Sequence, residues 1–407
     1  MSAPSRGKFG ISPTVVKLGI VSLLTDVSSE SIYPLIPLFL KSVLRAQVVD
    51  IGLIEGLAES TASVLRIFSG WLSDKTGGRK WITVAGYSLS TVSKPLLYLS
   101  TSWQQVLGIR FSDRLGKGIR SAPRDALIAD VTSPESRGIA FGFHRAMDTV
   151  GAITGPLIAY ILLRTFVGSV GTQGIPEALY RRIFLFSAIP AALGVLILII
   201  FVTEKRHANA NGKPPSLGLH GFSPGFKKFL AVTVLFSIGN SSDAFLILRA
   251  QNVGISTLNI LLVYVLFNTV EAAFDTLAGA VSDRIGRKNV ILAGYVVFAV
   301  VYAGFGFAGH PSAIWVLFGV YGLYSAMTQG VQRAFAADLT SSNERGTGMG
   351  AYQMLSGLAL LPASLVAGYL WSHIGPAAAF YYGAATALCA AILLGVFFPI
   401  STTCTDK

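Results

Sequence analysis

The sequence contains GWLSDKTGGRKWITVAGY at residues 70–87 and GAVSDRIGRKNVILAGY at residues 279–295, two copies of one stretch that differ in length by one residue. A second pair repeats without a gap at an offset of 208: ALIADVTSPESRG at residues 126–138 and AFAADLTSSNERG at residues 334–346. Two separate matches at nearly the same offset are improbable by chance. The chain is therefore predicted to be a duplicated unit, with equivalent elements in its two halves.

The composition excludes a soluble protein. Hydrophobic residues make up 52% of the chain and charged residues 13%, with a mean hydropathy of +0.61, whereas soluble domains carry about 25% charged residues. A helix needs about 20 apolar residues to cross a bilayer. Several stretches of that length lack Asp, Glu, Lys and Arg: residues 183–203, 289–309, 311–332, 346–372 and 375–405.

Spans and turns together predict an all-α membrane protein with twelve transmembrane helices in two six-helix bundles. The predicted spans are residues 14–40, 48–72, 80–100, 103–130, 138–163, 180–203, 228–250, 256–281, 289–309, 312–338, 346–371 and 376–400. Residues 204–227 are polar and rich in Gly and Pro, so they predict a cytoplasmic linker. The linker separates an N-terminal bundle, residues 1–203, from a C-terminal bundle, residues 228–407.

The distribution of basic residues predicts the orientation. With both termini in the cytoplasm, cytoplasmic segments hold sixteen of the 32 Lys and Arg, the outer loops six and the spans the other ten. This asymmetry predicts a multi-pass inner (plasma) membrane protein with cytoplasmic N- and C-termini. The net charge of +12 is dispersed among apolar segments, which argues against a nucleic-acid partner. Cys389 and Cys404 form no disulfide framework.

The duplicated loops, the twelve spans and the central linker resemble the major facilitator superfamily over essentially the whole chain. Both loop copies carry the pattern G-x-x-x-D-[RK]-x-G followed by basic residues. A further pattern resembles the fifth-helix motif of drug/proton antiporters: Gly142, Gly151, Gly155 and Pro156. Ala159 and Tyr160 replace the closing glycines of that motif. The resemblance implies a transporter that works by alternating access, exports by antiport and holds its site between the two bundles.

The duplicated loops predict a cytoplasmic gate. Asp74 and Asp283 follow the second and eighth spans, where each carboxylate is predicted to contact a helix N-terminus of the other bundle, near residues 345–348 or 137–139. Such a contact contributes about 0.3–1 kcal/mol when exposed. The resemblance adds further gate residues: Gly70, Lys75, Arg79, Asp130, Gly279, Arg284, Arg287 and Asp338. The alternative is that these residues only set topology and tighten turns.

The fourth span carries the densest charge. At about 100° per residue, six charged residues of RFSDRLGKGIRSAPRD share one stripe about 120° wide. They are Arg110, Asp113, Arg114, Lys117, Arg120 and Arg124. Each would cost about 2.5–3.5 kcal/mol facing lipid, so the stripe is predicted to face water or counter-charges. The segment near Arg110 resembles the fourth-helix arginine motif of the superfamily. Asp113 and Arg114 replace its usual Gln and Gly, which leaves either Arg110 or Arg114 in the central role.

The first span supplies candidate counter-charges. Asp26 and Glu30 lie on one helix face at i and i+4. A carboxylate in a desolvated cavity beside a movable arginine changes its proton affinity as the cavity opens and closes. Asp26 and Glu30 are therefore the predicted proton-coupling residues, with Arg110 or Arg114 as the switch. The alternative is a permanent ion-pair lattice that holds the first, second and fourth spans together.

The remaining polar residues of the spans predict the substrate cavity. Its predicted lining is Glu55, Glu59, Asp113, Lys117, Arg120, Asp243, Asn268, Glu271, Tyr321 and Tyr324. Aligning residues 28–30 with residues 241–243 makes Asp243 the counterpart of Glu30. The offset of 209 relates Arg66 to Asp275 and suggests a pair across the bundles. His144 in the fifth span is either a satisfied polar residue or a proton relay.

These patterns predict a secondary active transporter, most simply a proton-coupled antiporter that exports a small organic compound. The alternatives are a uniporter or proton symporter for an organic anion, which the cationic fourth span suggests, and a non-transporting receptor. No catalytic or metal-ligating pattern supports an enzyme, a metal site or a cofactor. The predicted partners are a small-molecule substrate, protons and the lipid bilayer, with the monomer as the functional unit.

Overall fold

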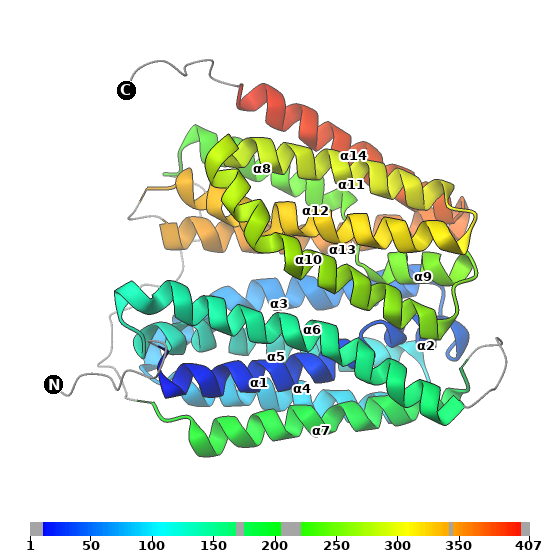
Figure 1. Ribbon diagram of the computed structural model, residues 1–407, viewed down its shortest axis with the longest axis horizontal. Coiled ribbons are helices and arrows are strands. Elements are labelled where there is room, and N and C mark those ends of the chain that lie inside the picture. The colour runs from blue at the N-terminus through cyan, green and yellow to red at the C-terminus, as the bar shows by residue number, and fades with distance from the viewer. Residues whose placement is uncertain (1–10, 168–174, 205–220, 342–344, 400–407) are drawn as a thin grey trace.

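The structure, a computed structural model, describes residues 11–167, 175–204, 221–341 and 345–399, and every regular element among these residues is helical (Figure 1). The N-terminal bundle contains α1 (Pro13–Ile32), α2 (Leu35–Ser42), α3 (Val48–Thr76), α4 (Lys80–Leu99), α5 (Trp103–Asp130), the short 3-10 turn η1 (Pro134–Ser136), α6 (Arg137–Val167) and α7 (Glu177–Phe201). The C-terminal bundle contains α8 (Pro224–Gly239), α9 (Ala244–Asn252), α10 (Thr257–Ile285), α11 (Arg287–Phe307), α12 (Pro311–Asp338), α13 (Arg345–His373) and α14 (Pro376–Phe397).

Among the described residues, seven helical segments are long and apolar enough to cross a membrane. Helices α3 and α5 are not among them, because both are rich in ionisable residues: α5 carries the predicted charged stripe, and α3 carries Glu55 and Glu59. The predicted all-α membrane fold with two six-span bundles is confirmed. Most of the predicted linker lies outside the described residues, and α8 begins at Pro224, four residues before the predicted start of the second bundle.

Two spans that were predicted as continuous are broken. The first divides into α1 and α2 at Tyr33 and Pro34, because a proline ring clashes with the preceding helical turn and supplies no N–H. The seventh divides into α8 and α9 at residues 240–243, although no proline is present there. The breaks fall at equivalent places in the two halves. Glu30 lies in α1, before the first break, and Asp243 lies within the second break as the N-cap residue of α9. The equivalence of these two carboxylates stays a prediction.

The duplication is visible in the helix bounds. Helix α10 begins and ends 209 residues after α3, and α13 begins 208 residues after α6. The most extensive contacts between the bundles are made by two equivalent pairs of helices, α3 with α13 and α6 with α10, and α9 adds smaller contacts with α2 and α3. Figure 1 shows the N-terminal bundle below the C-terminal bundle, with these four helices at the boundary. After the predicted orientation, we call the end where α1 begins and α14 ends the inner end, and the opposite end, which holds α2 and α9, the outer end.

The antiporter-like glycines have a packing role in the structure. A Cβ atom on Gly151 would lie 2.9 Å from the carbonyl oxygen of Leu23, and one on Gly155 would lie 2.8 Å from that of Val27. These two glycines therefore allow the backbones of α1 and α6 to approach closely, as small residues do between membrane helices. Gly142, in contrast, has nothing within 4 Å of its would-be Cβ.

We predict that Gly155→Leu lowers the stability of the protein by about 1–3 kcal/mol, because the added side chain overpacks the contact between α1 and α6. The measurement is the thermal unfolding midpoint of purified protein in detergent. Gly142→Leu is the matched control on the same helix and is expected to leave the midpoint unchanged. Equal losses in the two variants would contradict the packing role.

Candidate functional site

A buried ion pair joins α3 to α5. The Arg110 guanidinium donates two hydrogen bonds to Glu55, from Nε to Oε1 over 3.1 Å and from Nη2 to Oε2 over 2.7 Å. Arg110 is 4% exposed and Glu55 1%. Bidentate geometry of this kind is the strongest arrangement for an arginine and a carboxylate. Glu55 and Arg110 therefore neutralise each other inside the N-terminal bundle.

A second ion pair lies one turn further along the same helices. Arg114 Nε lies 2.9 Å from Glu59 Oε1, and Asp113 lies between the two arginines, 3.6 Å from Arg110 and 3.9 Å from Arg114. The predicted interior orientation of the stripe is confirmed, because Arg110, Asp113, Arg114 and Arg120 are all buried. The ion-pair partners of Arg110 and Arg114 in the structure are carboxylates of α3 and α5, whereas the sequence had suggested Asp26 and Glu30.

Other members of the stripe also have local partners. Arg120 donates to Ser90 over 2.7 Å and lies over the ring of Tyr87, and Arg124 pairs with Asp125 over 2.8 Å. Lys117, also on α5, makes no ion pair within 4.0 Å among the described residues.

The first-span carboxylates are held more loosely. Asp26 has no hydrogen bond or ion pair within the part of the chain that the structure describes. Glu30 accepts a hydrogen bond of 3.3 Å from the hydroxyl of Tyr264, which belongs to α10 of the other bundle. Both carboxylates therefore keep acceptor capacity, whereas Glu55 and Glu59 are occupied by arginines.

One buried lysine is not among the residues predicted from the sequence. Lys94 of α4 is 2% exposed and donates to the Ser28 hydroxyl over 2.8 Å, and Ser28 in turn donates to the carbonyl of Ser187 over 2.5 Å. Its surroundings in sequence, SLSTVSK at residues 88–94, were the available signal, because hydroxyl-rich helix faces accompany buried charge. A lone lysine six residues from a predicted span end instead resembles an interfacial anchor.

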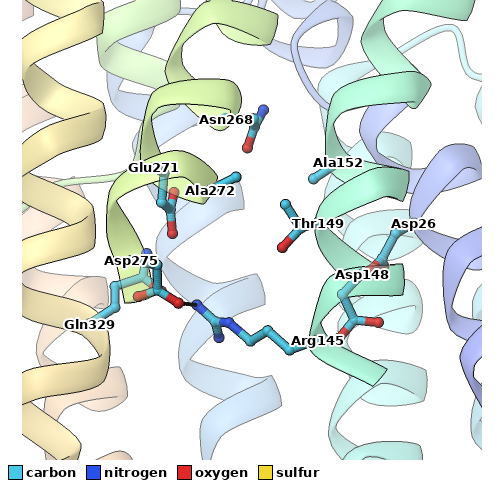
Figure 2. A pocket seen from close by; sticks show the side chains of 10 residues that line it. All are labelled: Asp26, Arg145, Asp148, Thr149, Ala152, Asn268, Glu271, Ala272, Asp275 and Gln329. Atoms are coloured by element: carbon cyan, nitrogen blue, oxygen red, sulfur yellow. Dashed lines mark ion pairs between the residues drawn. The ribbon is translucent and has the colours of Figure 1, made fainter. Parts of the chain in front are cut away.

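A cavity of about 190 Å³ lies between the two bundles. Figure 2 shows its walls, formed by α6 on one side and α10 on the other, with α1 and α12 contributing at the edges. The lining residues are Asp26, Arg145, Asp148, Thr149, Ala152, Asn268, Glu271, Ala272, Asp275 and Gln329. Of the residues predicted to line a substrate cavity, Asn268 and Glu271 line this one, and the predicted coupling residue Asp26 joins them.

The two facing walls carry the same spacing. Residues 145, 148, 149 and 152 of α6 and residues 268, 271, 272 and 275 of α10 both follow the i, i+3, i+4, i+7 pattern of one helix face. This pattern was the signal in the sequence that would have identified Arg145, Asp148 and Asp275. It was not recognised because helix pairing across bundles is not visible in one sequence.

Two contacts between the bundles occupy equivalent positions. Arg145 of α6 pairs with Asp275 of α10 over 3.4 Å, the dashed contact in Figure 2. At the other interface Arg66 of α3 donates to Gln353 of α13 over 3.2 Å. Asp275 is the counterpart of Arg66 at an offset of 209, and Gln353 that of Arg145 at 208. The suggested pairing of Arg66 with Asp275 is therefore wrong, because the two residues lie in different interfaces.

Aromatic residues occupy the level just outward of the cavity. The Tyr321 hydroxyl donates to Asp243 over 2.7 Å, and the Tyr324 hydroxyl accepts from Asn240 over 3.2 Å. The ring of Tyr321 lies 5.3 Å from that of Phe267. The predicted cavity residues Asp243, Tyr321 and Tyr324 thus lie at the break between α8 and α9, where Tyr321 bonds to Asp243 and Tyr324 to Asn240.

The inner loops hold one ion network in each half. Arg79 pairs with Asp74 over 3.2 Å and Asp130 over 2.9 Å. Arg287 pairs with Asp283 over 3.5 Å and Asp338 over 2.5 Å. Both networks stay inside their own bundle, and among the described residues neither Asp74 nor Asp283 makes an ion pair with the other bundle. The gating role of these loops remains a prediction.

His144 of α6 contacts Asp148, one of the residues that line the cavity. It is 4% exposed, and its Nδ1 lies 3.4 Å from Asp148 Oδ2, while its Nε2 and the Oδ1 of Asp148 have no hydrogen-bond partner among the described residues. Asp148 therefore lines the cavity with one buried carboxylate oxygen that accepts no hydrogen bond among the described residues.

Two pseudo-symmetric helical bundles with a polar cavity between them define a membrane transporter. Comparison with known proteins agrees: the chain belongs to the Major Facilitator Superfamily, whose family model matches residues 18–248 and residues 229–406. It is a multi-pass membrane transporter of that family rather than an enzyme.

Two relatives and one solved structure illustrate the similarity. An uncharacterized MFS-type transporter of Methanocaldococcus jannaschii is 36% identical over 94% of both chains. The fosmidomycin resistance protein of Escherichia coli is 26% identical over 70% of this chain and 68% of its own. A crystal structure of a POT family transporter in complex with a thioalcohol-conjugated peptide superposes with a TM-score of 0.80 over 97% of this chain and 98% of its own, at 12% identity, which shows a shared fold.

We predict that Arg110→Met destabilises the protein by about 3–5 kcal/mol, because it leaves the Glu55 carboxylate buried and unpaired. The double variant Glu55→Leu/Arg110→Met removes both charges and is expected to recover much of that loss. Thermal unfolding in detergent measures both. Glu177→Gln, which breaks the exposed pair with Arg181, is the control and should cost about 0–1 kcal/mol. A double variant less stable than the single one would contradict this assignment.

Proposed function

We propose that the protein is a proton-coupled antiporter that exports a small organic compound from the cell. The observation that carries the proposal is Asp26, a carboxylate that lines the cavity between the bundles and has no hydrogen bond or ion pair within the described residues. Ionisable residues inside membrane spans are costly and usually serve transport. A carboxylate without a fixed partner is able to exchange a proton for a substrate.

The coupling mechanism follows from competition at the cavity. When the cavity faces the outer side, the desolvated Asp26 carboxylate takes up a proton, with Glu30 next to it on the same face of α1. When it faces the inner side, the proton leaves and the ionised carboxylate receives the substrate. Arg110 and Arg114 are proposed to fix the surrounding lattice through Glu55 and Glu59 rather than to switch between partners.

Export is supported by one relative and one sequence pattern. The similarity to a fosmidomycin resistance protein suggests removal of a compound from the cell. The glycines of α6 resemble the drug/proton antiporter motif, although two of them are also explained by close packing on α1. The duplicated loops, with their paired arginines and aspartates, are proposed to gate the inner end.

A second candidate is a uniporter or proton symporter for an organic anion. It is favoured by Lys117, a cation of α5 without an ion pair within 4.0 Å among the described residues. In that case Lys117→Gln abolishes anion transport and Asp26→Asn has little effect. The two candidates therefore differ in which variant is inactive.

We predict that Asp26→Asn abolishes substrate-driven proton movement. Inverted membrane vesicles are acidified by respiration, and a panel of organic cations, anions and neutral compounds is added while a pH-sensitive dye reports the lumen. At least one compound is expected to release protons through the wild-type protein and not through Asp26→Asn, because an amide cannot carry a proton. Glu177→Gln, exposed at the outer end of α7, is expected to behave as wild type.

The antiport proposal fails if no compound of the panel moves protons through the wild-type protein. It fails equally if Asp26→Asn retains the response. Proton release that is lost in Lys117→Gln alone, and only with anions, would instead favour the second candidate.

We further propose that the protein acts as a monomer in the plasma membrane with both termini in the cytoplasm. In a background without Cys389 and Cys404, Gly78→Cys in the loop between α3 and α4 is expected to react with an impermeant maleimide only when the inner face is exposed. Gly309→Cys, between α11 and α12, is the control and should react only from the outside. Both positions have room, since nothing lies within 4 Å of a Cβ there. The opposite labelling pattern would reverse the orientation.

A further inference from the structure

The cavity between α6 and α10 carries an excess of negative charge. Its lining contains four carboxylates, Asp26, Asp148, Glu271 and Asp275, and one cation, Arg145. Arg145 pairs with Asp275 over 3.4 Å. The other three carboxylates make no ion pair with an arginine or lysine within 4.0 Å among the described residues, and the one basic neighbour at ion-pair distance is His144, 3.4 Å from Asp148.

The nearby cations do not remove this excess. Arg110 and Arg114 are paired with Glu55 and Glu59, as described above. Lys117 and Arg120 of α5 are not among the lining residues.

Aromatic residues lie one helical turn outward of the cavity lining, although none of them is itself a lining residue. Tyr264 and Phe267 precede the lining residues Asn268 and Glu271 by one helical turn on the same face of α10. The ring of Tyr264 lies 5.7 Å from that of Tyr33, and the ring of Phe267 lies 5.3 Å from that of Tyr321. Aromatic faces attract cations within about 6 Å. Carboxylates that line the cavity, with aromatic rings on their outward side, are the two elements that recognise an organic ammonium group.

We propose that this cavity binds an organic cation, namely an amine or a quaternary ammonium compound with an apolar substituent. The positive group lies among Glu271, Asp148 and Asp26, and the substituent contacts the rings of Tyr264 and Phe267. This inference rests on the proposed transport function and names its substrate class. The carboxylate of Asp148, which lines the cavity, is one acceptor for the positive group.

Arg145 has a defined part in this arrangement. As the one cation among the lining residues, it competes with an entering ammonium group for the carboxylates around it, Asp275 first. Figure 2 shows the guanidinium reaching across from α6 to α10 at the inner edge of the lining. Because the Arg145–Asp275 pair also joins the two bundles, a bound cation that displaces it loosens one of the two contacts between equivalent helices.

Binding to purified wild-type protein in lipid nanodiscs tests the proposal without any proton gradient. The probes are tetramethylammonium, benzyltrimethylammonium and, as an anion of similar size, benzenesulfonate, measured by isothermal titration calorimetry. We expect benzyltrimethylammonium to bind more tightly than tetramethylammonium, and benzenesulfonate not to bind. Glu271→Gln should weaken cation binding by about tenfold or more, because it removes an acceptor charge from a desolvated site.

A misfolded variant is distinguished from a binding defect by two further proteins. Arg145→Gln removes the internal competitor and should tighten cation binding several-fold, a gain that misfolding cannot produce. Glu271→Asp keeps the charge and should restore most of the affinity lost in Glu271→Gln. Absence of cation binding to wild type, binding of benzenesulfonate instead, or equal cation affinity in wild type and Glu271→Gln would each overturn the inference.

The test separates this inference from the proposed function. If the cations bind as expected but move no protons in vesicles, antiport fails and the substrate class stands. If protons move only with anions or neutral compounds and no cation binds, the substrate class fails and antiport stands.

Discussion

The need to compensate charge inside the membrane governs this structure. Each ionisable side chain facing lipid at mid-membrane would cost about 2.5–3.5 kcal/mol, so the charged face of α5 has to turn inward and find partners. Glu55 and Glu59 of α3 neutralise Arg110 and Arg114. These pairs join α3 to α5, and α3 in turn faces α13 of the other bundle. The position of the interface between α3 and α13 therefore depends on the ion pairs that hold α3 against α5.

Duplication produced equivalent helices, and divergence gave them different chemistry. One interface holds an ion pair, Arg145 with Asp275, and the equivalent interface holds a hydrogen bond, Arg66 with Gln353. The N-terminal bundle contributes most of the buried charge, while the C-terminal bundle contributes the aromatic cluster around Tyr321. A site between such halves is asymmetric, which a transporter needs if it is to bind one chemical group in one orientation.

Much of the fold was predictable because long apolar stretches identify membrane helices in a single sequence. The loop motifs, which repeat at offsets of 208 and 209, identify the duplication. The inward orientation of the α5 stripe followed from its energy cost alone. The breaks in the first and seventh spans were missed. The first break lies at Pro34, but a proline inside a helix produces either a kink or a break, and the sequence does not show which. The second break contains no proline. Lys94 was missed because a buried lysine and an interfacial lysine look alike in sequence.

The sequence by itself determined the class of protein, the number of spans, the duplication and the inward orientation of the charged stripe on α5, since these depend on composition and on periodicity along one helix. Only the tertiary structure decided which charges neutralise each other. It assigned the arginines of α5 to α3, left Asp26 without an ion pair in the described residues, and placed Arg145 opposite Asp275. The reason is physical: an ion pair depends on separations of a few ångströms between different helices, and helical periodicity carries no information about which helix is the neighbour.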